Sequence, residues 1–228
     1  MTAANIERSV GYAAVLNLAM IAILSGRPYF SNASRPIRGI TNPILAMEVV
    51  RDVAEVDAVL SDAPSADREV MRIKKYAGFG FICAYTALYV LMSMLLVDEG
   101  RAIAISAAGL GSAAAIFDVI GNLGILRIVD VDLAHATQAM IDAVRYPSLV
   151  KWALASLALC LLGIIALRAR RTGLRIVGAL NILASMLGLY ALYRNVGLQW
   201  LAYFGPISLV GLAILYFRPY WRKTGRSA

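Results

Sequence analysis

Hydrophobic residues along the chain gather in six blocks, each about long enough to cross the hydrocarbon core of a bilayer. Such a crossing takes about 20 apolar residues in a helix, and a helix satisfies its own backbone hydrogen bonds where water is absent. The pattern therefore predicts an all-α fold, a polytopic membrane helical bundle, as a single integral-membrane domain over residues 1–228. About six transmembrane helices are expected, over residues of about 9–25, 77–97, 102–126, 148–167, 173–193 and 196–217.

The long connection after the first block has a different, helical pattern. Asn42 can cap a helix whose first residue is Pro43. Apolar residues then recur on one side of this helix: Leu45, Val49, Val53, Val56 and Leu60. Acidic residues line another side: Glu48, Asp52 and Glu55. The spacing predicts an amphipathic interfacial helix pair after the first span, over about 43–61 and 65–76.

This helix pair can lie on the membrane surface, or pack against the bundle or a partner subunit. Its acidic polar side favours packing, because anionic lipid attracts Lys and Arg. A second short amphipathic stretch, Asp132–Val144, is expected at the interface. Arg145, Tyr146 and Pro147 are then expected to turn the chain into the fourth span.

Composition and charge support a membrane protein. The chain is 60% hydrophobic and 16% charged, whereas soluble domains are about half apolar and a quarter charged. All 14 acidic residues lie at or before Asp142, and the rest of the chain is basic. These basic residues flank apolar blocks, so they indicate loops beside anionic lipid rather than nucleic acid. The loop 168–175 and the C-terminus are therefore expected in the cytoplasm, and with six spans the N-terminus also.

The first block also resembles a signal peptide in length. Glu7 and Arg8 leave it without a clearly positive leading segment, and Leu24-Ser25-Gly26 is a poor cleavage site. We expect a retained first span. If it were removed, five spans would remain with the same C-terminal orientation.

Asp118 is the only acidic residue inside the long apolar blocks. A carboxylate at the bilayer centre costs from about 2.5–3.5 to more than 10 kcal/mol, depending on the method. On a helix, Asp118 shares a side with small residues and Asn122, so it should point into the bundle. The small residues are Ala107, Gly111, Ala114 and Ala115.

No cation is expected at the depth of Asp118. Arg127 lies about 13 Å further along the helix axis, and Lys151 begins a different span. Asp118 would then be protonated, because burial raises the pKa of a carboxyl group, or it would contact a cation or a water-filled cavity. The alternative is a neutral, hydrogen-bonded Asp118 that fixes the register of its helix.

Polar sides on other spans supply candidate neighbours for this carboxyl group. The resulting candidate intramembrane polar site comprises Asp118, Asn122, Asn181, Ser185, Tyr89 and Thr86. The sequence assigns no catalytic residue and no cofactor. The single histidine, His135, has too few companions for a zinc site, so no metal is expected. Cys83 and Cys160 both fall inside spans and do not form a disulfide framework.

Three classes of function fit these observations. The first is a non-enzymatic integral membrane protein acting through contacts, as a subunit, assembly or lipid- or pigment-binding component of a membrane complex. The second is a small transporter or ion-conducting protein, with Asp118 as its proton or cation site. The third is a membrane enzyme acting on a lipid substrate. The expected partners are membrane lipid and a partner subunit or a second copy of the chain.

Overall fold

The fold, obtained as a computed structural model, is a bundle of long helices. The structure describes residues 2–31, 35–60 and 64–224. Within these ranges the regular structure is helical, apart from an isolated bridge between Ile37 and Ile40. The long helices are α1 (Ala3–Ser25), α4 (Pro64–Leu95), α5 (Arg101–Val129), α6 (Gln138–Arg168), α7 (Thr172–Tyr193) and α8 (Val196–Thr224). The short ones are α2 (Pro43–Met47), α3 (Val53–Leu60), η1 (Val97–Glu99) and η2 (Leu133–His135).

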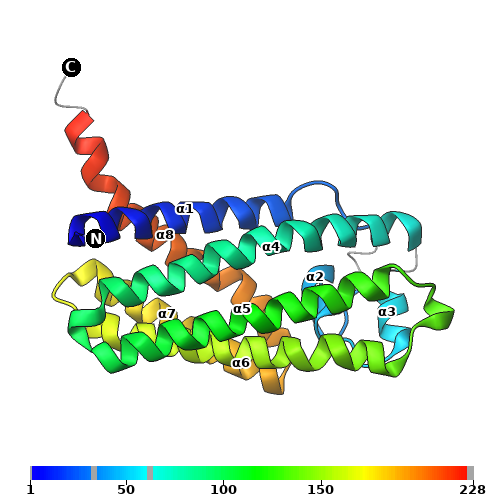
Figure 1. The fold of residues 1–228 in the computed structure, drawn as a ribbon. Coiled ribbons are helices and arrows are strands. Elements are labelled where there is room, and N and C mark those ends of the chain that lie inside the picture. Colours follow the sequence, from blue (N-terminus) through cyan, green and yellow to red (C-terminus); the bar gives the residue numbers. More distant parts are fainter. Residues whose placement is uncertain (1, 32–34, 61–63, 225–228) are drawn as a thin grey trace.

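The six long helices form a closed ring in chain order. Each packs against the helix before and the helix after it, and α8 returns to pack against α1. Each is long and apolar enough to cross a membrane, which confirms the expectation of six candidate spans. Figure 1 shows the helices running side by side, with α2 and α3 at the end of the bundle away from the N-terminus.

Two apolar cores fill this bundle. The cap core joins α2 and α3 to the ends of α4, α5 and α6, through residues such as Met47, Val56, Met71, Ile125 and Ile141. The span core lies among the long helices towards the N-terminal end, and includes Val10, Met92, Ala107, Leu162 and Leu212. We call the segment from α2 to α3 the cap.

The amphipathic helix expected over 43–61 is divided into α2 and α3. Asn42 caps α2 as expected, because its Oδ1 accepts a hydrogen bond from the Ile44 amide at 3.0 Å. All five residues from Ala46 to Val50 are buried, which a straight amphipathic helix cannot achieve since consecutive side chains point around its axis. Asp52 then starts α3 by accepting from the Glu55 amide at 2.9 Å. Residue 61 lies outside the described residues.

Two other boundaries differ from the expected ones. The stretch 65–76 and the second span form one helix, α4, which begins at Pro64. Likewise α6 begins at Gln138 and continues through Pro147, where a turn was expected. Proline removes a backbone donor, but membrane helices tolerate this where neighbouring helices pack closely. Three helices of the bundle therefore extend past their apolar blocks, and the cap packs against these extensions.

Candidate functional site: a buried charge network beneath the cap

Buried polar side chains lie inside the ring, and every one of the six long helices contributes at least one. They include Asn17 of α1, Ser93 of α4, Asp118 and Asn122 of α5, Lys151 and Ser156 of α6, Asn181 and Ser185 of α7, and Ser208 of α8. The cap adds a buried carboxylate, Glu48, to this set. Three ion pairs between buried side chains meet where α2, α4, α5 and α6 converge.

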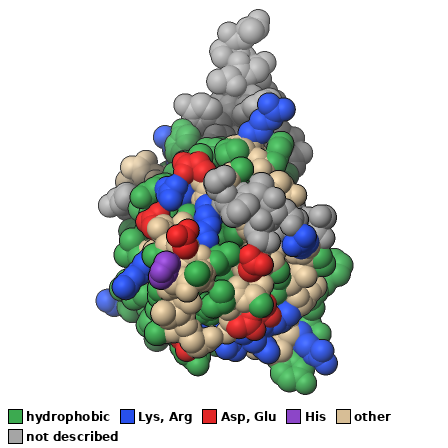
Figure 2. Space-filling model, turned by 90° about the vertical axis from the view of Figure 1, so that its right-hand side faces the viewer, with side chains coloured by type: hydrophobic (Ala, Val, Ile, Leu, Met, Phe, Trp, Pro, Cys, Tyr) green, Lys and Arg blue, Asp and Glu red, His purple; other side chains and the backbone are tan. Residues whose placement is uncertain are grey.

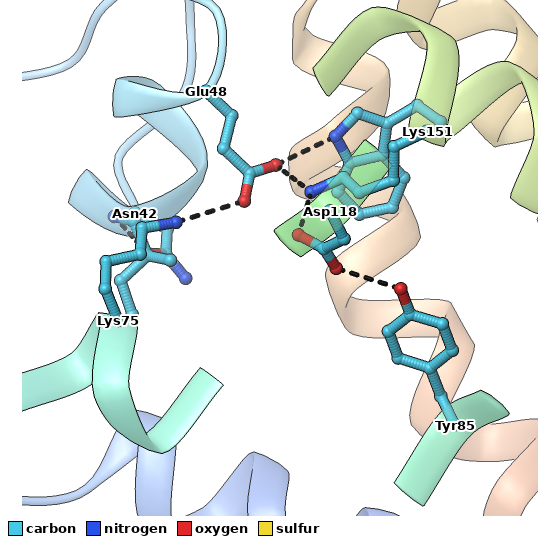
Figure 3. Close-up of polar contacts among 8 residues, drawn as sticks. Asn42, Glu48, Lys75, Tyr85, Asp118 and Lys151 are labelled. Carbon is cyan, nitrogen blue, oxygen red and sulfur yellow. Dashed lines mark hydrogen bonds and ion pairs between the residues drawn. The ribbon is translucent and has the colours of Figure 1, made fainter. Parts of the chain in front are cut away.

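Two carboxylates and two ammonium groups form this charge network (Figure 3). Lys151 Nζ lies 2.6 Å from Glu48 Oε2 and 3.1 Å from Asp118 Oδ1. Lys75 Nζ lies 3.2 Å from Glu48 Oε1. All four residues are at most 9% exposed, so two negative and two positive charges balance one another away from water.

Two neutral donors complete the network. Trp152 Nε1 donates to Glu48 Oε2 at 2.9 Å, and Tyr85 Oη donates to Asp118 Oδ2 at 3.1 Å. Each of the four carboxylate oxygens therefore accepts at least one hydrogen bond from the chain itself. The Lys151 ammonium also lies 4.6 Å from the centroid of the Trp152 ring, within the range of a cation–π contact.

Contacts with α8 and α4 hold the cap over the network. At the start of α2, Gln199 Oε1 accepts from the amides of Thr41 and Asn42 at 3.1 and 3.2 Å, which joins the cap to α8. Next to Lys75, the Lys74 ammonium bonds the carbonyl oxygens of Ile23 and Gly26 at the end of α1. The two adjacent lysines of α4 therefore fasten the cap and α1 to the same helix.

Asp118 is not isolated from cations, so that expectation was wrong. Lys151 seemed to lie at the edge of a span that begins at residue 148, but α6 begins ten residues earlier. At 1.5 Å per residue, Asp118 lies about 26 Å along its helix from Arg101, and Lys151 lies about 26 Å along its helix from Arg168. Both arginines lie at the opposite end of the bundle, so the two charged groups share one level.

Electrostatics keeps Glu48 ionised. Burial alone would raise the pKa of this carboxyl group, since desolvation disfavours the charged form. The positive charges of Lys151 and Lys75 outweigh that effect, together with the hydrogen bonds that these groups donate, and lower the pKa of Glu48 to about 2. Glu48 therefore carries its full negative charge at neutral pH.

The stripe of small residues that precedes Asp118 on α5 is buried, as expected. One of its members, Gly111, faces Tyr89 so closely that an added Cβ would lie 2.5 Å from the ring carbon Cγ. Asn122 is buried too, and its Nδ2 lies beside Gly78 of α4, where an added Cβ would be 3.2 Å away. Asp118 accepts hydrogen bonds from Lys151 and Tyr85 rather than from Asn122.

The remaining residues of the expected polar site form contacts elsewhere in the bundle. Thr86 donates to the Ile82 carbonyl oxygen of its own helix at 2.6 Å, and Tyr89 Oη donates to the carbonyl oxygen of Ala155 at 3.2 Å. Asn181 Oδ1 accepts from Ser208 Oγ at 2.6 Å, which links α7 to α8. Ser185 is buried on the same helix as Asn181. The structure brings none of these groups into hydrogen-bonding contact with Asp118.

Sequence reasoning missed Glu48, Lys75, Lys151 and Trp152 as members of this site. A signal for two of them exists in the sequence. Glu48 interrupts the apolar run Ala46-Met47-Glu48-Val49-Val50, and Lys151 stands inside an apolar block. Charged residues in such runs are buried only with partners. Two lone charges of opposite sign, Glu48 and Lys151, are therefore candidates for an ion pair with each other.

The described residues offer no group of three or more His, Cys, Asp and Glu side chains that could hold a metal ion. His135 is exposed in η2, and the free cysteines Cys83 and Cys160 lie on α4 and α6. No match to this chain was found among the models of known protein families, the curated proteins or the solved structures.

Proposed function

We propose that this chain is a non-enzymatic integral membrane protein that acts through contacts, with the cap as its main contact surface. The observation that carries the proposal is the saturation of the charge network. All four carboxylate oxygens of Glu48 and Asp118 accept hydrogen bonds from Lys75, Lys151, Trp152 and Tyr85. Removing one partner from such a pair leaves an uncompensated buried charge, so the network favours one position of the cap.

The level of the network supports a membrane boundary close to it. Exposed aromatic side chains surround the bundle near this level: Tyr29 after α1, Tyr76 beside Lys75 on α4, Tyr146 on α6, Tyr193 at the end of α7 and Trp200 on α8. Tyr and Trp are enriched where membrane helices leave the hydrocarbon. A hydrocarbon core about 30 Å thick, with its other boundary near Arg101 and Arg168, would end close to the network.

On this placement the cap and the helix extensions lie at or beyond one membrane surface. Figure 2 views this end of the molecule, where acidic and basic side chains are mixed with apolar ones. On α3, Val56 and Leu60 face the cap core, while Asp57 and Ala54 are exposed. A helix that packs one side against the cap core and exposes a carboxylate on the other suits contact with a partner subunit or a second copy of the chain. With both termini in the cytoplasm, as the charge distribution predicts, this surface would face the other side of the membrane.

Site-specific photo-crosslinking tests this proposal. A photoreactive residue in place of Asp57 is expected to capture a protein partner or a second copy in native membranes. The matched control replaces Ile116, which is exposed on the outer side of α5 and should face lipid. If the Ile116 position captured protein as efficiently as the Asp57 position, the cap would not be a specific contact surface.

A specific observation favours transport as a second candidate. The hydroxyl groups of Ser93 and Ser156 are buried and have no hydrogen-bond partner among the described residues, and each of the six spans contributes buried polar side chains to the interior. Such groups can line a path for a proton or a cation. In liposomes that contain a pH-sensitive dye, proton flux through the protein that is lost in both Asp118→Asn and Ser156→Ala would favour transport over the contact proposal. Equal dye responses of these variants, the unchanged protein and empty liposomes would exclude proton transport.

A further inference from the structure

A cavity at the C-terminal end of α7 is lined mainly by arginine residues. It has a volume of about 480 Å³ and lies between the cap and the α7–α8 connection. Its lining comprises Arg38, Arg51, Tyr193, Arg194, Asn195 and Val196. Three of these six side chains are guanidinium groups, and no acidic residue is among them.

One arginine of the cavity is held in place by the cap. The guanidinium of Arg38 donates to the Val49 carbonyl oxygen at 3.2 Å and forms an ion pair with Glu55. Its backbone φ is 51°, in the left-handed region that residues other than glycine rarely adopt. Gly39 follows with a φ of 81°, and the bridge between Ile37 and Ile40 closes the turn. The turn therefore holds Arg38 in the cavity wall despite an unfavourable backbone conformation.

The other two arginines, Arg51 and Arg194, have exposed side chains that can contact a ligand. The backbone of Arg51 is fixed from both sides, because its amide donates to Glu55 Oε2 at 2.8 Å and its carbonyl oxygen accepts from Gln138 at 2.8 Å. Its side chain is exposed, as is that of Arg194, whose Cζ lies 5.5 Å from the centroid of the Tyr193 ring. Across the described residues, the salt bridges found do not involve either guanidinium. With Glu55 balancing Arg38, the cavity keeps two unbalanced positive charges.

We infer that this cavity binds a phosphate group, carried either by an anionic lipid head group or by a small phosphate-containing solute. Guanidinium groups match phosphate oxygens with paired hydrogen bonds, and Arg51 and Arg194 can provide this recognition from two segments of the cavity wall. The adjacent Tyr193 ends a candidate span, so the cavity opens where lipid head groups would lie. Phosphate binding here requires neither the contact function nor transport, because the cavity residues are not members of the charge network.

Binding of two probes by the purified full-length protein tests the inference. The probes are inorganic phosphate, followed by isothermal titration calorimetry in a neutral detergent, and short-chain phosphatidylglycerol, followed by native mass spectrometry. The variants Arg51→Gln and Arg194→Gln are each expected to weaken binding of the preferred probe about five- to tenfold at low ionic strength, because each removes a charged hydrogen-bond donor. Higher salt should reduce the difference from the unchanged protein.

Arg145→Gln is the matched control. Arg145 also lies beside an exposed tyrosine, with its Cζ 5.9 Å from the centroid of the Tyr146 ring, but it does not line the cavity. Its replacement should change binding by less than about twofold, since only the long-range charge is altered. Loss with phosphatidylglycerol alone would support a lipid head group, and loss with inorganic phosphate would support a soluble ligand. Equal weakening by Arg145→Gln, or no binding of either probe, would overturn the inference.

Discussion

Replacing Glu48 with glutamine tests whether the charge network holds the cap against the bundle. The variant Glu48→Gln keeps the length of the side chain but removes one of two negative charges. Lys75 would lose its ion pair, and Lys151 would keep only Asp118. The buried network would then carry one excess positive charge, which the surrounding apolar core cannot solvate.

The structure gives the size of this effect. Lowering the pKa of Glu48 from 4.5 to about 2 corresponds to about 3 kcal/mol of folding free energy at neutral pH, at about 1.4 kcal/mol for each pKa unit. Breaking a buried ion pair by removing one partner costs a similar 3–5 kcal/mol in general. We therefore expect Glu48→Gln to lower the free energy of unfolding by about 3 kcal/mol.

Unfolding by a denaturing detergent in mixed micelles measures this loss, followed by far-UV circular dichroism. Glu55→Gln is the control, because Glu55 belongs to the same cap and pairs with Arg38, but is 22% exposed. A partly exposed pair of this kind is worth less than about 1 kcal/mol. The double variant Glu48→Gln/Lys75→Met restores a neutral network and should recover part of the loss. Equal effects of the two glutamine variants, or a double variant less stable than Glu48→Gln, would refute the electrostatic reasoning.

Three further predictions follow from the same structure. Since the pKa of Glu48 is lowered on folding, the stability that Glu48 contributes should be complete above about pH 4.5 and lost as the pH falls towards 2. Between these pH values, circular dichroism in detergent should show a steeper loss of stability for the unchanged protein than for Glu48→Gln, and parallel curves would contradict this. Gly163→Ala should lower the free energy of unfolding in detergent by roughly 1–3 kcal/mol, because its Cβ would lie 2.8 Å from the Gly178 carbonyl oxygen. The control Gly109→Ala, whose Cβ would have nothing within 4 Å, should not destabilise α5, and equal losses in the two variants would be evidence against close α6–α7 packing. Asp118→Asn should destabilise the protein by more than about 1 kcal/mol in the same assay, because Lys151 keeps one counter-ion of two; unchanged stability would show that this ion pair contributes little.

Much of the fold was predictable because it depends on local patterns. Six apolar blocks predicted six candidate spans, and the pair Asn42-Pro43 correctly predicted a helix start, since capping involves neighbours only a few residues apart. The small residues before Asp118 predicted its buried side of α5 for the same reason. Helix ends were less accurate where apolar content changed but the helix continued, as in α4 at residue 77 and α6 at residue 148.

The charge network was not predictable to the same degree, because its contacts join distant parts of the chain. Glu48 meets Lys75 across 27 positions and Lys151 across 103. Helical spacing gives the side on which each residue lies, but not how a helix is rotated against its neighbours. It placed Glu48 on the polar side of an amphipathic helix, whereas the structure buries it. Closing the ring and folding the cap onto it determine which charges meet.

The position of the network explains how one chain can bury four charges. An isolated carboxylate in mid-membrane would be costly, but Asp118 lies on the same level as Lys151 and pairs with it at 3.1 Å. On the placement proposed above, this level would be close to the end of the hydrocarbon. The cap then shields these charges from water, and Glu48 supplies the second negative charge that balances Lys75 and Lys151. Without Glu48 the lysines of α4 and α6 would be buried with a single carboxylate. The charges of the helices beneath the cap therefore favour its position, which links the cap to the helical bundle rather than leaving it a separate loop.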